Sequence, residues 1–133
     1  MLTTITDFTI QLLLLTFLLI TFLQSGLDKI VDRKENIAFL QGHFKGTFLV
    51  KNIPFFVSFL AVLDIIISIL TIVGIAEIFL YQTTFYGFMA AVLSAKVLLI
   101  LLFGQRVAKD YEGAKTITVY FIATIMALYF LKY

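Results

Sequence analysis

Two ionisable residues stand inside stretches that are otherwise apolar. Asp64 interrupts residues 53–80, whose one other charge, Glu77, lies near the outer end and is expected to reach the interface, and Lys96 interrupts residues 85–103. A charge in hydrocarbon costs at least ~2.5–3.5 kcal/mol on insertion scales, so such a residue is usually paired, protonated or facing water. At about 1.5 Å per helical residue, Asp64 lies roughly 16 Å and Lys96 roughly 10 Å from the same membrane surface. An extended lysine side chain can cover that difference, so we expect a contact between Asp64 and Lys96, direct or through water.

This charged pair has two possible roles. One is functional, as a proton relay or a site for a quinone head group; the other is an ion pair that only sets the register of two helices, and the sequence favours the second. Ser68 and Thr71 follow Asp64 at spacings of four and seven, which places all three on one helix face. Their hydroxyls are expected to hydrogen-bond between helices or to extend a polar pocket at Asp64.

Several other chemistries lack the residues they need. The chain has no cysteine, which excludes disulfides and thiolate metal sites. His43 is the one histidine, so we predict no metal site built from this chain. Phosphate-binding loops, dinucleotide fingerprints, HExxH and a Ser/His/Asp arrangement are also missing from the sequence. We therefore predict no catalytic residues and expect the chain not to be an enzyme on its own.

The composition indicates what must position these charges. Of the 133 residues, 62% are hydrophobic and only 14% are charged, with a mean hydropathy of +1.08. Soluble domains are about 45–50% apolar and about 25% charged. A water-soluble fold of this size could not hide so much apolar surface, because small domains have a high surface-to-volume ratio. The expected solvent is therefore the lipid bilayer.

The apolar runs have the length of membrane-spanning helices. Roughly 20 helical residues cross a bilayer core of about 30 Å. The runs are continuously apolar, whereas strands of membrane barrels alternate in polarity. We predict an all-α integral membrane protein, a single domain over residues 1–133 that forms a bundle of four transmembrane helices. The predicted helices are 6–27, 53–80, 85–103 and 114–131.

Two shorter patterns refine this arrangement. Apolar residues recur at helical spacing over 34–48, which predicts a short helix in the membrane interface, with an ordinary loop as the alternative. Gly87, Ala91 and Ala95 recur every four residues. Such a stripe of small side chains lets helices approach closely, and we expect it to face the interior of the bundle.

The basic residues predict the orientation in the membrane. An even number of spans puts both termini on one side. The two long connections hold Lys29, Arg33, Lys34, Lys45, Lys51, Arg106, Lys109 and Lys115, whereas Lys132 lies on the opposite side. The positive-inside rule then places the connections in the cytoplasm and both termini outside. Because topology accounts for these residues, nucleic-acid binding is not expected.

A short motif resembles a known family. Phe22, Ser25, Gly26 and Lys29 form the pattern F-x-x-S-G-x-x-K at the end of the first predicted helix, and Asp64 follows in the second. This pattern resembles the signature of the DoxX-like family of small four-helix membrane proteins, whose size and layout are also similar. From their positions, Gly26 is expected to let the chain leave the helix, and Lys29 to reach lipid phosphate.

The resemblance implies an accessory function. DoxX-like proteins are similar to the small membrane subunits of a thiosulfate–quinone oxidoreductase. We therefore expect a subunit of a quinone-linked or respiratory complex in a bacterial-type inner membrane, with other membrane subunits as partners and a quinone as candidate ligand. Since the chain lacks cysteine, any redox centre must belong to a partner or to the quinone. The alternatives are a structural or assembly subunit of another membrane machine and a small carrier or channel.

Overall fold

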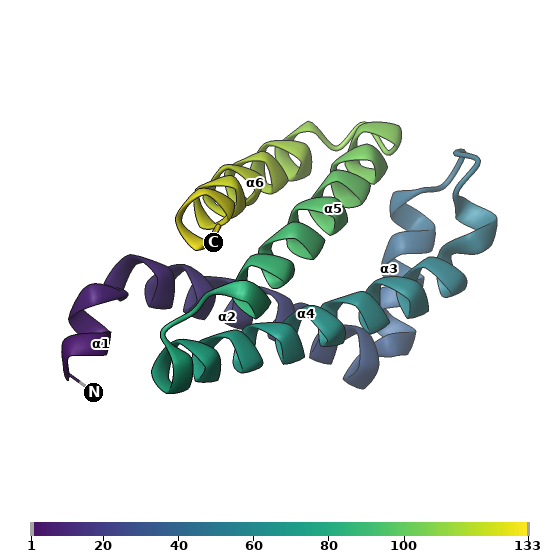
Figure 1. Ribbon diagram of the computed structural model, residues 1–133. Helices are drawn as coiled ribbons and strands as arrows, with labels where there is room; N and C mark the ends of the chain where they lie inside the picture. The colour runs from purple at the N-terminus through teal and green to yellow at the C-terminus, as the bar shows by residue number, and fades with distance from the viewer. Residues whose placement is uncertain (1, 133) are drawn as a thin grey trace.

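The computed structural model describes residues 2–132, which form α-helices joined by short connections (Figure 1). Four of these helices are long and apolar enough to cross a membrane. The protein is thus an all-α, four-helix membrane protein, as predicted. The described helices are α1 (Leu2–Asp7), α2 (Thr9–Val31), α3 (Arg33–His43), the 3-10 helix η1 (Val50–Asn52), α4 (Ile53–Tyr81), α5 (Phe85–Val107) and α6 (Tyr111–Leu131).

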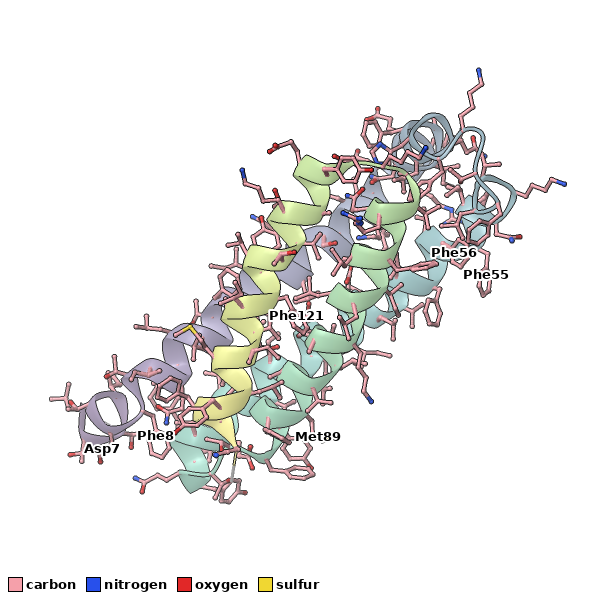
Figure 2. The ribbon with its side chains drawn as sticks, turned by 90° about the horizontal axis from the view of Figure 1, so that it is seen from above. Asp7, Phe8, Phe55, Phe56, Met89 and Phe121 are labelled. Atoms are coloured by element: carbon pink, nitrogen blue, oxygen red, sulfur yellow. The ribbon has the colours of Figure 1, made fainter. Side chains whose placement is uncertain are left out.

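The four long helices run alternately up and down. α2 packs mainly on α4, α4 on α5, and α5 on α6, while α6 also touches α2 (Figure 1). The N- and C-terminal regions meet at one end, where Gln11 Nε2 donates to the carbonyl oxygen of Phe130 at 3.3 Å. Figure 2 shows Phe55 and Phe56 at the opposite end from Asp7 and Phe8. Both long connections therefore lie at the same end of the bundle.

A close approach of α4 and α5 fixes their register. A Cβ atom added at Gly74 would lie 2.7 Å from the backbone nitrogen of Gly87, so a side chain there would force the helices apart. The small residues in the first half of α5 face inward: Gly87, Ala90, Ala91, Ser94 and Ala95 are buried. The prediction that this stripe lies inside the bundle is confirmed, and it explains how two helices joined by a tight turn pack so closely.

Several helix ends differ from the predicted bounds. α2 begins at Thr9 rather than at residue 6, after the short helix α1, and α4 ends at Tyr81 rather than at residue 80. α2 continues to Val31 rather than ending at 27, and α5 continues to Val107 rather than 103. α6 begins at Tyr111 rather than 114, because the carboxylate of Asp110 accepts a hydrogen bond from the backbone nitrogen of Gly113 at 2.9 Å. Aspartate is a favoured N-terminal cap because it satisfies a free N–H of the first turn. The predicted helices ended where the sequence stops being apolar. A helix continues into charged sequence when its terminal backbone groups and the charges find hydrogen-bond partners.

The first long connection is folded rather than loose. The segment predicted at 34–48 contains α3 (Arg33–His43), followed by a turn with Gly46 at a positive φ of 83°. Phe44 packs with Ile53 and Val57 at the start of α4. His43 Nε2 lies 3.0 Å from Oε1 of Gln105 at the end of α5. α3 thus closes one end of the bundle by joining the two long connections.

Candidate functional site

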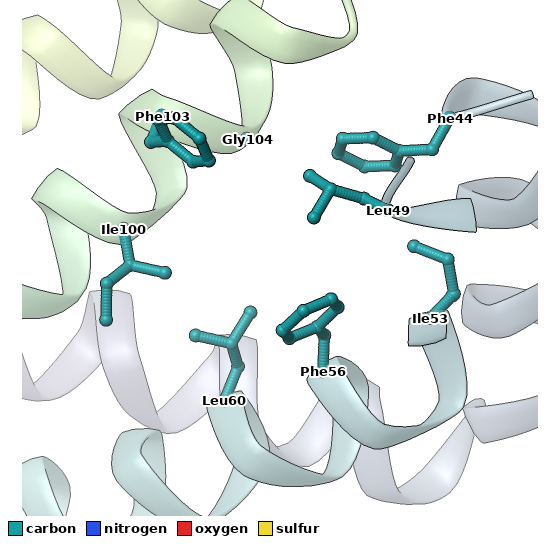
Figure 3. A pocket seen from close by; sticks show the side chains of 8 residues that line it. All are labelled: Phe44, Leu49, Ile53, Phe56, Leu60, Ile100, Phe103 and Gly104. Atoms are coloured by element: carbon teal, nitrogen blue, oxygen red, sulfur yellow. The ribbon is translucent and has the colours of Figure 1, made fainter. Parts of the chain in front are cut away.

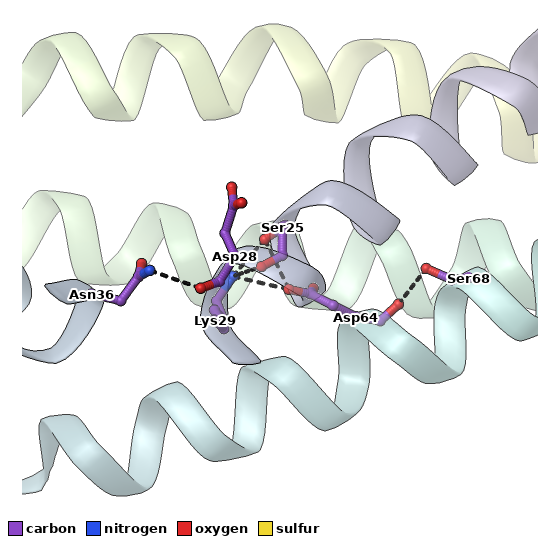
Figure 4. A network of polar contacts seen from close by, with 6 residues as sticks. All are labelled: Ser25, Asp28, Lys29, Asn36, Asp64 and Ser68. Carbon is purple, nitrogen blue, oxygen red and sulfur yellow. Dashed lines mark hydrogen bonds and ion pairs between the residues drawn. The ribbon is translucent and has the colours of Figure 1, made fainter. Parts of the chain in front are cut away.

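Asp64 is buried at the contact between α2 and α4, and its partner is Lys29. The distance from Lys29 Nζ to Asp64 Oδ2 is 2.9 Å, and the two side chains are 14% and 2% exposed (Figure 4). The predicted contact of Asp64 with Lys96 is therefore wrong. The prediction that Lys29 reaches lipid phosphate is also wrong, because its ammonium group points into the bundle.

The residues of the F-x-x-S-G-x-x-K pattern all lie on one face of α2, because their spacings of three, four and seven bring them together on a helix. Phe22 is buried in the core. The Ser25 hydroxyl donates to Asp64 Oδ2 at 2.8 Å. A Cβ atom at Gly26 would lie 3.1 Å from Asp64 Cβ, so this glycine brings α2 close to α4 instead of ending the helix as predicted.

The pair is closed into a small hydrogen-bonded cluster. Asp64 Oδ2 accepts from both Ser25 and Lys29, and Lys29 Nζ also donates to the Ser25 hydroxyl. Hydrogen bonds to the charged groups replace the water they lose, which is what makes a buried ion pair tolerable. Because Lys29 lies two residues before the end of α2, the cluster sits between the membrane interior and the end of the bundle that carries the long connections.

The predicted polar stripe has a more local role. Ser68 and Thr71 are buried on the same side of α4 as Asp64. Their hydroxyls donate to backbone oxygens one turn earlier, Ser68 to Asp64 at 2.8 Å and Thr71 to Ile67 at 2.7 Å. Both hydroxyls are therefore satisfied within α4, and Figure 4 shows that Ser68 bonds the backbone oxygen of Asp64 and not its carboxylate.

Lys96 lies at a depth similar to that of Asp64 but faces outward. The Gly74–Gly87 contact sets the register of the antiparallel helices α4 and α5. Ten residues from this contact toward the long connections, Asp64 on α4 therefore lies opposite residue 97 on α5. Lys96 is exposed, whereas Ala95 and Val97 beside it are buried. Successive helical residues are about 100° apart, so a similar depth does not give a shared direction. The carrier alternative required a cavity shared by these two charges, and the structure places them in different surroundings.

A cavity of about 540 Å³ lies beside the cluster, between α2, α5 and α6. Its volume is in the range of pockets that bind small molecules. Ser25 lines it and so connects the cavity to Asp64. The lining also offers polar groups from Thr21, Gln24, Asp28 and Tyr120 among apolar side chains. Tyr120 is held by an edge-on contact with Phe17, whose ring centre is 6.2 Å away.

Sequence reasoning missed the charged partner on α2 and the cavity. Lys29 lay outside the predicted helix, so it was assigned to the membrane surface. Its spacing of four from Ser25 was the available signal, since an uninterrupted helix would bring both to the face that packs on α4. The described residues contain no cluster of three or more metal-ligating side chains.

The fold and the site define a four-helix membrane protein with a buried ion pair next to a partly polar cavity. No protein-family profile, curated protein or solved structure matches this chain. The resemblance to the DoxX-like family therefore depends on the motif residues and on the similar size and layout.

Proposed function

We propose that this chain binds a quinone head group in the cavity beside the Ser25–Asp64–Lys29 cluster, as an accessory subunit of a quinone-linked membrane oxidoreductase. The observation that carries the proposal is the position of Ser25, which lines the cavity and hydrogen-bonds the buried carboxylate. The convergence of the motif residues with Asp64 supports the DoxX-like assignment, because Ser25, Gly26 and Lys29 all contact or closely approach this carboxylate residue.

The cavity matches the chemistry of a quinone in two respects. A quinone ring is apolar on both faces and carries carbonyl oxygens that accept hydrogen bonds. The phenolic hydroxyl of Tyr120 and the amide of Gln24 are donors at the cavity wall, with Phe17, Leu98 and Leu101 as apolar neighbours. Such a mixture of apolar walls and a few polar groups is typical of small-molecule sites.

The ion pair would serve proton transfer in this proposal. Reduction of a quinone to a quinol takes up two electrons and two protons. The electrons would come from a redox centre of a partner subunit, since this chain has no cysteine and one histidine. The Ser25 hydroxyl would turn its O–H from Asp64 to the quinone oxygen and take a proton in return from the Lys29 ammonium group, which already donates to it. Lys29, whose side chain is 14% exposed, would then regain its proton from water at the end of the bundle.

We place the protein in a bacterial-type inner membrane with both long connections in the cytoplasm. The eight basic residues of these connections belong to one end of the bundle, and Lys132 to the other. The positive-inside rule supports this orientation. Lys29, two residues from the end of α2, would then connect the cluster to the cytoplasmic side, from which protons for quinol formation are taken up.

Titration of the purified protein in lipid nanodiscs with decylubiquinone tests the proposal. We expect saturable binding that weakens about threefold to tenfold in Tyr120→Phe, because one hydrogen bond contributes ~0.5–1.5 kcal/mol. Tyr129→Phe is the matched control, since Tyr129 is on the same helix but 63% exposed and away from the cavity. Unsaturable partitioning of decylubiquinone into the disc, equal in all variants, would contradict the proposal.

One observation favours a purely structural subunit as the second candidate. In the part of the chain that the structure describes, every buried side-chain polar atom has a hydrogen-bond partner. The Lys29–Asp64 pair is thus complete without a ligand and could serve only to fix the register of α2 on α4. In that case the double variant Lys29→Met/Asp64→Leu would still assemble into its native complex, and the activity of that complex would be unchanged.

A further inference from the structure

Lys96 lies in the middle of a membrane-spanning helix and points away from the bundle. It is eleven residues from each end of α5 (Phe85–Val107), or about 16 Å at 1.5 Å per residue. In the described part of the chain it makes no hydrogen bond or ion pair. An extended lysine side chain covers less than half of that distance, so its ammonium group would remain in hydrocarbon if lipid surrounded it.

We propose that the outer face of α5, centred on Lys96, binds a transmembrane helix of a different protein that carries a carboxylate at mid-bilayer depth. An intramembrane cation needs a partner of opposite charge, because hydrocarbon offers no hydration. The inference rests on the accessory-subunit part of the proposed function and names the contact by which such a subunit would join its complex.

A second copy of this chain cannot supply the carboxylate. Seven of its eight acidic residues lie toward helix ends or in the connections: Asp7, Asp28, Asp32, Glu35, Glu77, Asp110 and Glu112. The eighth, Asp64, is 2% exposed and already bound to Lys29. Symmetric pairing of two α5 faces would instead bring two Lys96 side chains together, which like-charge repulsion opposes.

The surface next to Lys96 provides an apolar docking area. Leu99, Ile100 and Phe103 follow Lys96 on the same face of α5 and are 52%, 45% and 58% exposed. Ile100 and Phe103 also line an apolar cavity of about 160 Å³ between α4, α5 and the segment after α3 (Figure 3). A partner helix can therefore pair its carboxylate with Lys96 and insert an apolar side chain one or two turns further along.

Site-specific photocrosslinking in native membranes tests the interface. A benzoyl-phenylalanine probe replaces Leu99, and a control probe replaces Ile125, which is 43% exposed on α6. We expect the probe at 99 to form an adduct with a membrane-spanning protein, mapped by mass spectrometry to a helix that contains Asp or Glu. Lys96→Met should lower the adduct yield about tenfold, equivalent to ~1.4 kcal/mol of association, while Lys96→Arg retains it.

A charge exchange completes the test. Lys96→Asp should abolish the adduct, and replacing the mapped partner acid with lysine should restore it. The isolated Lys96→Met chain should unfold in detergent no earlier than the original, which excludes loss of folding as the cause. An adduct between two copies, no adduct at 99, or an adduct that Lys96→Met leaves unchanged would overturn the proposal.

The two proposals can fail separately. The quinone cavity takes Leu98 and Leu101 from α5 but not Lys96, so Lys96→Met should leave decylubiquinone binding unchanged. A charge-dependent adduct without quinone binding would retain the interface and reject the quinone site. Quinone binding without a charge-dependent adduct would reject the interface alone.

Discussion

The Lys29–Asp64 pair permits a sharp test of what holds α2 against α4. The carboxylate of Asp64 is 2% exposed, and Lys29 Nζ is 2.9 Å away. Removing one member of a buried pair leaves an uncompensated charge and costs about 3–5 kcal/mol, whereas replacing both members with apolar residues of similar size is often neutral. Lys29→Met should therefore lower the free energy of unfolding by ~3–5 kcal/mol.

The two members should not be equivalent. Asp64 has a short side chain far from either end of α4, so without Lys29 it keeps only the Ser25 hydrogen bond. Lys29 is 14% exposed and two residues from the end of α2, so without Asp64 it can turn toward the membrane surface. Asp64→Asn should accordingly cost less than Lys29→Met, about 1–3 kcal/mol, the usual penalty for an unsatisfied buried polar group.

Equilibrium unfolding in mixed micelles, followed by circular dichroism, measures these differences. The double variant Lys29→Met/Asp64→Leu should recover to within about 1 kcal/mol of the original chain. A double variant whose loss equals the sum of the losses of Lys29→Met and Asp64→Leu made singly would refute the reasoning, because independent losses mean that the side chains do not interact. Single variants that each lose less than ~0.5 kcal/mol would refute it as well, since that is the scale of an exposed pair.

Two further predictions concern packing and topology. Gly74→Ala should destabilise the protein by ~1–3 kcal/mol, because its new methyl group meets the backbone of Gly87. The control Gly42→Ala, on exposed α3 where nothing lies within 4 Å of the added methyl group, should be neutral or stabilising. Equal unfolding curves for the two variants would contradict this prediction. The chain has no cysteine, so Thr3→Cys and Lys45→Cys each introduce a single thiol at an exposed position. In whole cells an impermeant maleimide should label the first and not the second, and the reverse pattern would invert the proposed orientation.

Much of the fold could be predicted because lipid imposes simple demands. Every backbone polar group in hydrocarbon must be satisfied within the chain, so long apolar runs become helices. The start of α4 at Ile53 and of α5 at Phe85 agree with the predicted starts at residues 53 and 85, where Pro54 and the polar turn mark clear boundaries. The inward orientation of the small-residue stripe of α5 could also be predicted, because closely packed helices need small side chains at their contact.

The charged helix ends were harder to predict. Hydropathy ends a helix at the first cluster of charges, yet α2 continues through Lys29 because Asp64 neutralises that charge inside the bundle. α6 begins before the apolar run because Asp110 caps it. In both cases a specific partner, rather than average polarity, decides where the helix ends.

The sequence by itself determined that the chain crosses a membrane, and that Asp64 and Lys96 lie within about 6 Å of each other in depth along neighbouring helices. Depth follows from counting residues along a helix of constant rise. Only the tertiary structure decided which neighbour Asp64 meets, because that depends on how each helix is rotated about its axis. Close packing at Gly26 and Gly74 sets those rotations. They turn Asp64 toward Lys29 and leave Lys96 on the outer face of the bundle.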